Sequence, residues 1–307
     1  MGPQRRRLRM PLTVSARQSS PSGEITDCHV HIFEARSLFP MQVEPAYEPP
    51  VSPVSALLDM AGVAGVSRFV LVQPTPYGDD LSLLQASLAA LGPRARGIGV
   101  AGHSAGTADL ARMNEAGIAG LRFVETRLAD GSRMPGTVPL DALCDSLAPR
   151  LGELGMHAEL WAPLPQTLSQ WPRLEKAGIP IVLDHMAGFN PAAGRGHEDF
   201  QRLLAILREG MVWVKLALCR RAVGADYDVI QPFHDAMIEA NSDRLLWASD
   251  FPFVRYPGTP PTVPGLLERF CHWVTDEAVA HRILVRNPAR LYRFGTAAGP
   301  SGHAGGC

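Results

Sequence analysis

Residues 25–33 read ITDCHVHIF, and the rest of the chain repeats the pattern that they set. The run begins with β-branched and apolar residues, which favour a buried strand, and it ends in His29 and His31. Because alternate side chains of a strand share a face, these two imidazoles point the same way. Paired imidazoles at the end of a strand can hold a metal ion or polarise a carbonyl group, so the sequence predicts a functional site there.

Seven more short apolar runs follow, and most of the eight precede a segment with helical periodicity. The predicted strands are Ile25–His31, Arg68–Gln73, Arg96–Ala101, Gly120–Phe123, Met156–Leu160, Pro180–Asp184, Val212–Leu216 and Arg244–Ser249. The predicted helices include Val54–Ala64, Leu81–Leu91, Thr107–Ala116, Leu140–Leu154, Phe200–Glu209 and Asp226–Asn241. Continuous apolar strands separated by helices indicate a parallel sheet covered by helices.

Eight such units in about 270 residues predict an α/β fold, a (β/α)8 TIM-like barrel. The alternative is an open, doubly wound sheet. That fold would carry a Gly-rich phosphate loop after the first strand, and the sequence has none there. In a barrel, catalytic side chains lie at the carboxyl ends of the strands, so the polar residues that interrupt the apolar runs are the candidates for a site.

Composition narrows the class of protein. The chain has 307 residues, 46% of them hydrophobic, which is enough for one large domain or two ordinary ones. Its 29 Lys and Arg residues balance 30 Asp and Glu residues, so no nucleic-acid partner is expected. No apolar run reaches the roughly 18 residues of a spanning helix, so no membrane partner is expected either. Five cysteines without a CxxC pair favour a reducing compartment and predict a cytoplasmic protein.

The two ends of the chain differ in composition from the body. Residues 1–23 are rich in Arg, Ser and Pro, and we expect a disordered leader without the apolar segment of a secretion signal. Residues 295–307 are rich in Gly and Ala, and we expect a disordered tail. Residues 24–294 are expected to form the barrel.

Two further polar residues follow predicted strands in positions suited to chemistry. His185 ends the sixth apolar run, where an uncompensated polar group would be costly, so we place it in the site. Asp250 follows the eighth run and precedes a proline turn, which suits a general base or a metal ligand. Asp184, beside His185, is interpreted either as a support for the site or as a structural residue.

Cationic residues follow the fourth and seventh strands. Arg122 ends the fourth run, and with Arg127 nearby it is suited to anion binding or to a salt bridge at the rim. Lys215 is interpreted as a residue of the barrel mouth or as half of a structural ion pair. Arg220 or Arg221 can bind a carboxylate, although both can equally be solvent-exposed.

Six motifs, taken in order, resemble the amidohydrolase superfamily. They are DCHVHIF, GLRF, VLDHMAGF, VKLA, LLWASDFP and RNPARLY, and they extend over about Glu24 to Phe294. The branch is the amidohydrolase-2 group, and the resemblance is closest to 2-pyrone-4,6-dicarboxylate lactonases and related lactone hydrolases. It implies a distorted (β/α)8 barrel that hydrolyses a small carboxylated lactone or a related ester, with a small anionic lactone as its partner molecule.

The resemblance also implies roles for individual residues. The aspartate after strand eight, which activates water, corresponds to Asp250. The histidines around the scissile carbonyl correspond to His29, His31 and His185. The groups that contact substrate, mostly arginines that hold its carboxylates, correspond to Arg122, Arg127, Arg220 or Arg221, and Tyr47. Residues 73–77 (QPTPY) and 253–256 (FVRY) depart from the pyrone lactonases at substrate-facing positions, which leaves the exact substrate open.

The resemblance leaves the metal question open. Arg122 would repel a second ion, so a two-metal centre is not expected, and the pyrone lactonases imply that no cofactor is required. One zinc ion held by His29, His31, Asp250 and His185 is chemically feasible. The alternatives are therefore a zinc-dependent lactonase or decarboxylase of the same superfamily and, from a different class, a non-catalytic ligand-binding barrel. Barrels of this kind often self-associate, so a homo-oligomer is one expected form.

Overall fold

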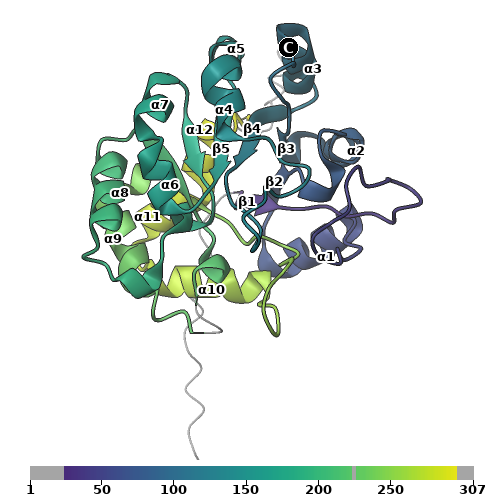
Figure 1. The fold of residues 1–307 in the computed structure, drawn as a ribbon. Helices are drawn as coiled ribbons and strands as arrows, with labels where there is room; N and C mark the ends of the chain where they lie inside the picture. The colour runs from purple at the N-terminus through teal and green to yellow at the C-terminus, as the bar shows by residue number, and fades with distance from the viewer. Residues whose placement is uncertain (1–23, 223–225, 296–307) are drawn as a thin grey trace, which may run out of the picture.

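A computed structural model describes residues 24–222 and 226–295 of the chain (Figure 1). The predicted leader, residues 1–23, and all of the predicted tail except Gly295 lie outside the described residues. Eight parallel strands stand side by side in chain order and form a nearly closed barrel, as the sequence predicts. The strands are β1 (Thr26–Val30), β2 (Arg68–Val72), β3 (Ala95–Gly99), β4 (Ile118–Val124), β5 (His157–Trp161), β6 (Ile181–Leu183), β7 (Val212–Leu216) and β8 (Leu245–Trp247).

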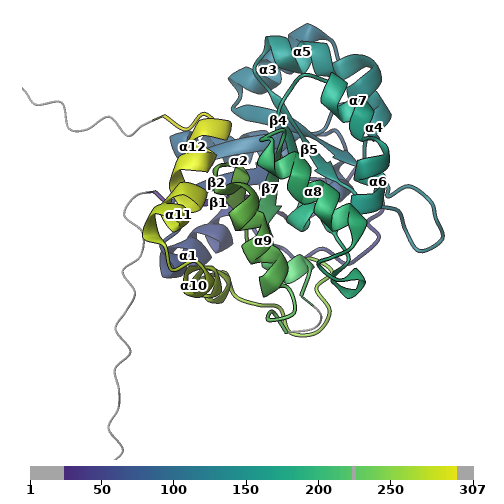
Figure 2. The ribbon, with the colours of Figure 1, turned by 90° about the vertical axis from the view of Figure 1, so that its left-hand side faces the viewer.

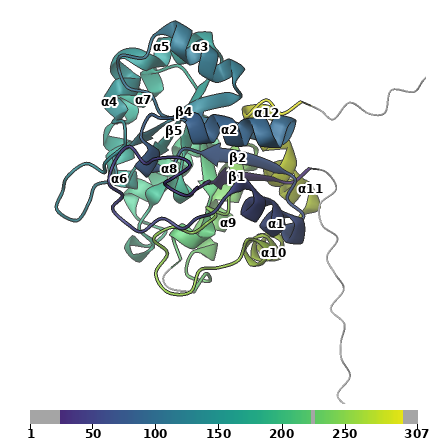
Figure 3. The same ribbon diagram turned by 90° about the vertical axis from the view of Figure 1, so that its right-hand side faces the viewer.

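Helices connect the strands and surround them. They are α1 (Val54–Ala64), α2 (Ser82–Leu91), α3 (Thr107–Glu115), α4 (Leu140–Ala142), α5 (Ala148–Glu153), α6 (Leu164–Ser169), α7 (Trp171–Lys176), α8 (Glu198–Arg208), α9 (Gln231–Asn241), α10 (Val263–Trp273), α11 (Glu277–His281) and α12 (Asn287–Leu291). Helix α10, which follows β8, packs beside α1, so the last part of the chain closes the ring against the first (Figures 2 and 3). None of the helices in the described ranges has the length and hydropathy needed to cross a membrane.

Two predicted helices differ in detail from the observed ones. The segment predicted as Leu140–Leu154 is divided into α4 and α5 by a π-helical turn at Leu143–Leu147. The segment predicted as Asp226–Asn241 becomes helical only at Gln231. Pro232 lies in the first turn of that helix, where the missing N–H of proline breaks no helical hydrogen bond, so the helix begins there.

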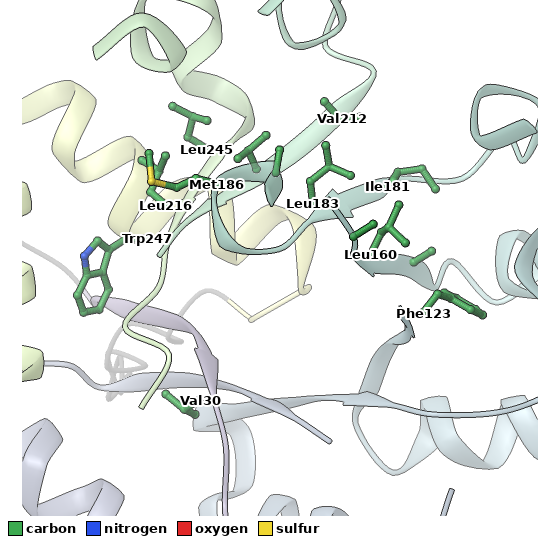
Figure 4. Close-up of a cluster of buried hydrophobic side chains, with 14 of the residues drawn as sticks. Val30, Phe123, Leu160, Ile181, Leu183, Met186, Val212, Leu216, Leu245 and Trp247 are labelled. Atoms are coloured by element: carbon green, nitrogen blue, oxygen red, sulfur yellow. The ribbon is translucent and has the colours of Figure 1, made fainter. Parts of the chain in front are cut away.

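Alternate residues of the strands face two different apolar layers. The outer layer lies between the strands and the helices and includes Phe123, Leu160, Leu183, Leu216 and Trp247 of β4 to β8 (Figure 4). The inner layer fills the barrel and includes Cys28, Val70, Ile98, Val182, Trp213 and Leu246. Burial on both faces explains why the strands read as continuous apolar runs. It also means that a polar residue in phase with the inner layer points into the barrel.

The barrel closes between β8 and β1 through the segments that follow these strands. Val30 bridges Phe251, the Asp250 N–H donates to the His29 carbonyl at 2.9 Å, and the His31 N–H donates to the Phe251 carbonyl at 2.8 Å. The Asp27 carboxylate adds a side-chain link, because its Oδ1 accepts from the N–H groups of Ser249 at 2.9 Å and His29 at 3.2 Å. This closure holds the residues after β1 and those after β8 side by side.

Burial of the Asp27 carboxyl group affects the free energy of unfolding by an amount that depends on pH. Burial raises the pKa of the Asp27 carboxyl group from 3.8 to about 7, although the hydrogen bonds from Ser249 and His29 oppose the shift. Between pH 3.8 and about pH 7 the folded chain binds one more proton at Asp27 than the unfolded chain does. Stability at this residue therefore falls as pH rises through that window.

We expect the free energy of unfolding to show this dependence. Between pH 5.5 and pH 8 the natural chain should lose about 2 kcal/mol more than the Asp27→Asn variant, which keeps the acceptor oxygen but cannot ionise. Urea unfolding followed by circular dichroism at both pH values measures the difference. Equal losses in the two proteins would show that Asp27 is ionised at no cost in the folded state.

Candidate active site

A cavity of about 380 Å³ opens at the carboxyl ends of the strands, where a barrel places its catalytic groups. Residues at or after the ends of successive strands line it: Arg122, Trp161, His185, Arg220, Arg221 and Asp250. His31, which follows β1, and Tyr47, in the loop after β1, also line the cavity. The structure therefore brings together in one cavity most of the site residues that the sequence predicts.

Asp250 lies at the centre of this group of residues. Its backbone φ is +66°, in the left-handed region that side chains other than glycine seldom adopt, so the surrounding structure holds it in a strained conformation. Its Oδ2 accepts from Arg220 Nε and lies 3.5 Å from His185 Nε2. Its Oδ1 is buried, lies 3.5 Å from His31 Nε2 and 3.6 Å from His29 Nε2, and accepts no hydrogen bond from the described residues.

Opposing effects decide the charge of Asp250. Burial alone would raise the pKa of this carboxyl group, but Arg220 and His185 hold it well below its ordinary value of 3.8. The carboxylate is therefore ionised throughout the neutral range. It combines a full negative charge with one oxygen, Oδ1, that is available to accept a proton.

The three predicted histidines gather around this carboxylate. His29 and His31 lie with their Nε2 atoms 3.3 Å apart, which confirms that the two imidazoles share a face. His29 is fully buried behind the cavity wall, whereas His31 and His185 line the cavity. Burial lowers the pKa of His29 well below 6.5 and also lowers the pKa of His185, so both rings are neutral at neutral pH.

His185 reaches the cavity because of its backbone. In strict alternation, Asp184 rather than His185 would follow Val182 toward the barrel interior. His185, Met186 and Ala187 all have φ between +52° and +60°, and this left-handed turn directs the His185 side chain inward as well. Both Asp184 and His185 thus lie beside His29, 3.2 Å away for the Asp184 Oδ1–His29 Nδ1 pair.

A network of buried charges lies beneath the cavity. Asp184 Oδ2 accepts from Arg122 Nε at 3.2 Å and Nη2 at 3.1 Å, while Asp184 Oδ1 lies 3.3 Å from Lys215 Nζ. Lys215 forms a second ion pair with Glu159, whose other oxygen accepts from Tyr292 at 3.1 Å. Lys215 is fully buried and does not line the cavity, so the ion-pair interpretation is the one the structure favours.

Four arginines are among the residues that line the cavity. Arg122 is bound to Asp184, and Arg220 is bound to Asp250. Arg221 donates to the Phe189 carbonyl at 3.0 Å, but it has no carboxylate partner in the described part of the chain and its buried Nε is unpartnered. Burial and the nearby Arg220 lower the pKa of Arg221, which is the signature of a cation that lacks an anion.

Three residues show where sequence reasoning differs from the structure. Arg127 is exposed in the loop after β4, donates to the Gly131 carbonyl at 3.1 Å and is not among the cavity-lining residues. Trp161 lines the cavity, with the Arg122 guanidinium 5.0 Å from its ring centroid, and was not among the predicted residues. Arg255 also lines the cavity. Its position in residues 253–256, which depart from the pyrone lactonases, was the sequence feature that could have identified it.

The spacing of three donor atoms fits one divalent ion. The ligand atoms of a tetrahedral zinc site, at about 2.0–2.1 Å from the ion, lie about 3.3–3.4 Å from one another. His29 Nε2, His31 Nε2 and Asp250 Oδ1 are separated by 3.3, 3.5 and 3.6 Å, and Oδ1 is buried without a hydrogen-bond partner from the described residues. These three residues could therefore hold a single ion.

An ionised aspartate beside neutral imidazoles, at the mouth of a (β/α)8 barrel, is suited to activating water, which places the chain among the barrel hydrolases. A family model described as amidohydrolase matches residues 26–294. The chain belongs to the amidohydrolase family.

Characterised relatives extend over almost the same length. The chain is 28% identical to a 2-pyrone-4,6-dicarboxylate hydrolase of Comamonas testosteroni, covering 89% of this chain and 90% of the relative. It is 30% identical to a 4-sulfomuconolactone hydrolase of Rhizobium radiobacter, covering 87% and 89%.

Solved structures share the fold. A putative 2-pyrone-4,6-dicarboxylic acid hydrolase from Pseudomonas putida superposes with a TM-score of 0.76 at 25% identity, covering 89% of this chain and 98% of that one. An amidohydrolase from Burkholderia multivorans with bound zinc superposes with a TM-score of 0.63 at 20% identity, covering 89% and 100%. At that identity the zinc-bound structure supports the barrel fold alone.

The buried charge network yields a prediction about stability. Lys215→Met leaves the Glu159 and Asp184 carboxylates with less compensating charge, so the free energy of unfolding should fall by about 3–5 kcal/mol. Removing the Glu159 charge as well, in Lys215→Met/Glu159→Gln, should restore at least half of the loss, because Asp184 keeps Arg122. Urea unfolding of the three proteins tests this, and a single variant as stable as the natural chain would mean that the network adds nothing.

Proposed function

We propose that this protein hydrolyses a small anionic lactone, with Asp250 activating the water that opens the ring. The observation that carries the proposal is the ionised Asp250 carboxylate, whose Oδ1 is free to accept a proton in a cavity lined by Arg122, Arg220, Arg221 and Arg255. The names of the two characterised relatives denote lactones that bear carboxylate or sulfonate groups. A cavity of about 380 Å³ suits a substrate of that size.

In the proposed reaction, Asp250 accepts a proton from water as the water oxygen bonds to the lactone carbonyl carbon. His185 and Arg122, which line the cavity, stabilise the negative charge that develops on the carbonyl oxygen. The ring C–O bond then breaks, and the proton held by Asp250 passes to the departing ring oxygen. An enol ester makes this last step easier, because an enolate is a good leaving group.

His29 and His31 support Asp250 in this scheme. Both Nε2 atoms lie within 3.6 Å of Asp250 Oδ1, and His29 is outside the cavity lining, so we propose that His29 acts through its neighbours rather than on substrate. His31 lines the cavity beside Oδ1 and helps to fix the position of the attacked carbonyl group.

Binding of the substrate carboxylate also changes the basicity of Asp250. A carboxylate whose pKa is held far below its ordinary value is a weak base, and Arg220 is the leading cause of that lowering. A substrate carboxylate that pairs with Arg220 would weaken the Arg220–Asp250 contact and so raise the basicity of Asp250. Arg221, which has no carboxylate partner in the described ranges, offers a second contact for the same anion.

A metal-dependent form of the reaction is the second candidate, favoured by the spacing of His29, His31 and Asp250. An ion bound there would supply a Lewis acid that polarises the carbonyl group, in a zinc-dependent lactonase or decarboxylase. A non-catalytic ligand-binding barrel is disfavoured, because a binding protein gains nothing from a buried, strained and unpartnered carboxylate oxygen.

We also propose that the protein acts in the reducing environment of the cytoplasm. Cys28, Cys144, Cys219 and Cys271 are all free thiols, and burial raises the pKa of each. Thiols with raised pKa values are poor nucleophiles, so these cysteines are interpreted as packing residues rather than as catalytic groups.

Asp250→Asn should reduce kcat for a carboxylated lactone by about 10³-fold, because asparagine cannot accept the proton. The steady-state hydrolysis rate, measured with 2-pyrone-4,6-dicarboxylate and 4-sulfomuconolactone as trial substrates, tests the prediction. Asp228→Asn, at an exposed position, is the matched control and should retain the natural rate. A folded Asp250→Asn variant with full turnover would refute the proposed mechanism.

Arg221→Gln should raise KM for the same substrate by about 10- to 100-fold while kcat changes less, because it removes a contact with the substrate anion. Arg127→Gln provides the comparison, since Arg127 lies outside the cavity and its loss should leave KM unchanged. If the two variants gave equal KM values, the anion would have to bind elsewhere.

A further inference from the structure

His29 Nδ1 lies between two groups that require opposite forms of the ring. Lys215 Nζ lies 3.2 Å from it and Asp184 Oδ1 also lies 3.2 Å from it. A lysine ammonium can only donate a hydrogen bond, whereas a carboxylate can only accept one. If Lys215 is the partner, the proton of the neutral ring is on Nε2; if Asp184 is the partner, the proton is on Nδ1.

The remaining contacts of the histidine pair distinguish these two tautomers. His31 Nδ1 lies 2.7 Å from the Val72 carbonyl oxygen, which only accepts, so Nδ1 carries the proton. In the neutral His31 ring, Nε2 is then an acceptor. It lies 3.3 Å from His29 Nε2, which must donate, and His29 Nδ1 is left bare to accept from Lys215.

All three contacts therefore run in one direction: Lys215 donates to His29, His29 donates to His31, and His31 donates to the Val72 carbonyl. The opposite tautomer would place two lone pairs against each other between the rings. Asp184 Oδ1 is consistent with this direction, because it is buried and accepts no hydrogen bond from the described residues despite its distance from His29.

Buried ion pairs fix the position of the Lys215 side chain. It is fully buried, it forms ion pairs with Glu159 and Asp184, and Tyr292 and His157 contact the Glu159 carboxylate from the other side. Its ammonium group therefore cannot swing away from His29 without breaking buried ion pairs, which are costly to lose.

We propose that Lys215 is a positioning residue that fixes His29 as the Nε2–H tautomer and so withholds the Nε2 lone pair from a metal ion. The proposal deepens the proposed function, on which it rests for the identity of the site. The donor atoms of His29, His31 and Asp250 are spaced for one zinc ion. The Nε2 atom of His29 nevertheless carries a proton, so its lone pair is not available to bind zinc. The site thereby favours base catalysis by Asp250 without a metal.

The natural chain alone provides the first test. Labelling its histidines with ¹⁵N and recording long-range ¹H–¹⁵N correlations reports the tautomer of each ring, and the His29 signals are assigned by their loss in His29→Gln. We expect a protonated Nε2 and a bare Nδ1 for His29, and the reverse for His31. A His29 ring protonated at Nδ1 in metal-free protein would overturn the proposal.

Zinc affinity provides the second test. Lys215→Met/Glu159→Gln removes the donor without leaving Glu159 ionised, and Glu159→Gln alone is the matched control that keeps Lys215. Titration calorimetry with zinc and a competing chelator should show at least tenfold tighter binding by the double variant than by the control, with His29 switched to the Nδ1–H form facing Asp184. Equal affinities would overturn the proposal.

Both measurements are independent of turnover, so they separate this inference from the proposed lactone hydrolysis. A chain that hydrolyses lactones yet holds His29 in the other tautomer would contradict the inference alone. If the double variant failed to fold, the tautomers of the natural chain would still decide the matter.

Discussion

The compensation of buried charge at the carboxyl ends of the strands is the constraint on which the site depends. Each of three buried carboxylates has its own cation: Asp250 has Arg220, Asp184 has Arg122, and Glu159 has Lys215. These pairings keep Asp250 and Asp184 ionised even though burial opposes ionisation. Asp27 shows the effect of burial without such a pairing, because hydrogen bonds from backbone N–H groups leave its pKa at about 7. A base that is ready at neutral pH therefore requires the arginine beside it.

Backbone strain at two residues positions their side chains in the site. Asp250 and His185 both have left-handed φ values, and each lies just after a strand in the wall of the cavity. The closure of the barrel between β1 and β8 holds Asp250 against the histidine pair, since the Asp250 N–H donates to the His29 carbonyl. The strain is sustained because apolar layers pack on the outside and the inside of the barrel around it.

The fold and the centre of the site were predictable from sequence for the same reason. Residues buried on both faces leave continuous apolar runs, so a polar residue such as Asp250 stands out where it follows such a run. Trp161 gave no such signal, because an aromatic residue at a strand end reads as core. The exposed position of Arg127 was also beyond sequence reasoning, since proximity to Arg122 along the chain says little about the direction of a loop. The left-handed turn at His185 depends on tertiary packing, which alternation along a strand does not encode.

The central claim is that Asp250, kept ionised by Arg220, is the base that activates water. The most direct test is the dependence of kcat/KM on pH for a carboxylated lactone, because this ratio reports the ionisation of the free enzyme. With the pKa of Asp250 held well below 3.8, the base stays ionised, so kcat/KM should show no tenfold fall per pH unit between pH 8 and pH 5. A tenfold fall for each pH unit below 7 would contradict the account, since it would identify an imidazole as the base.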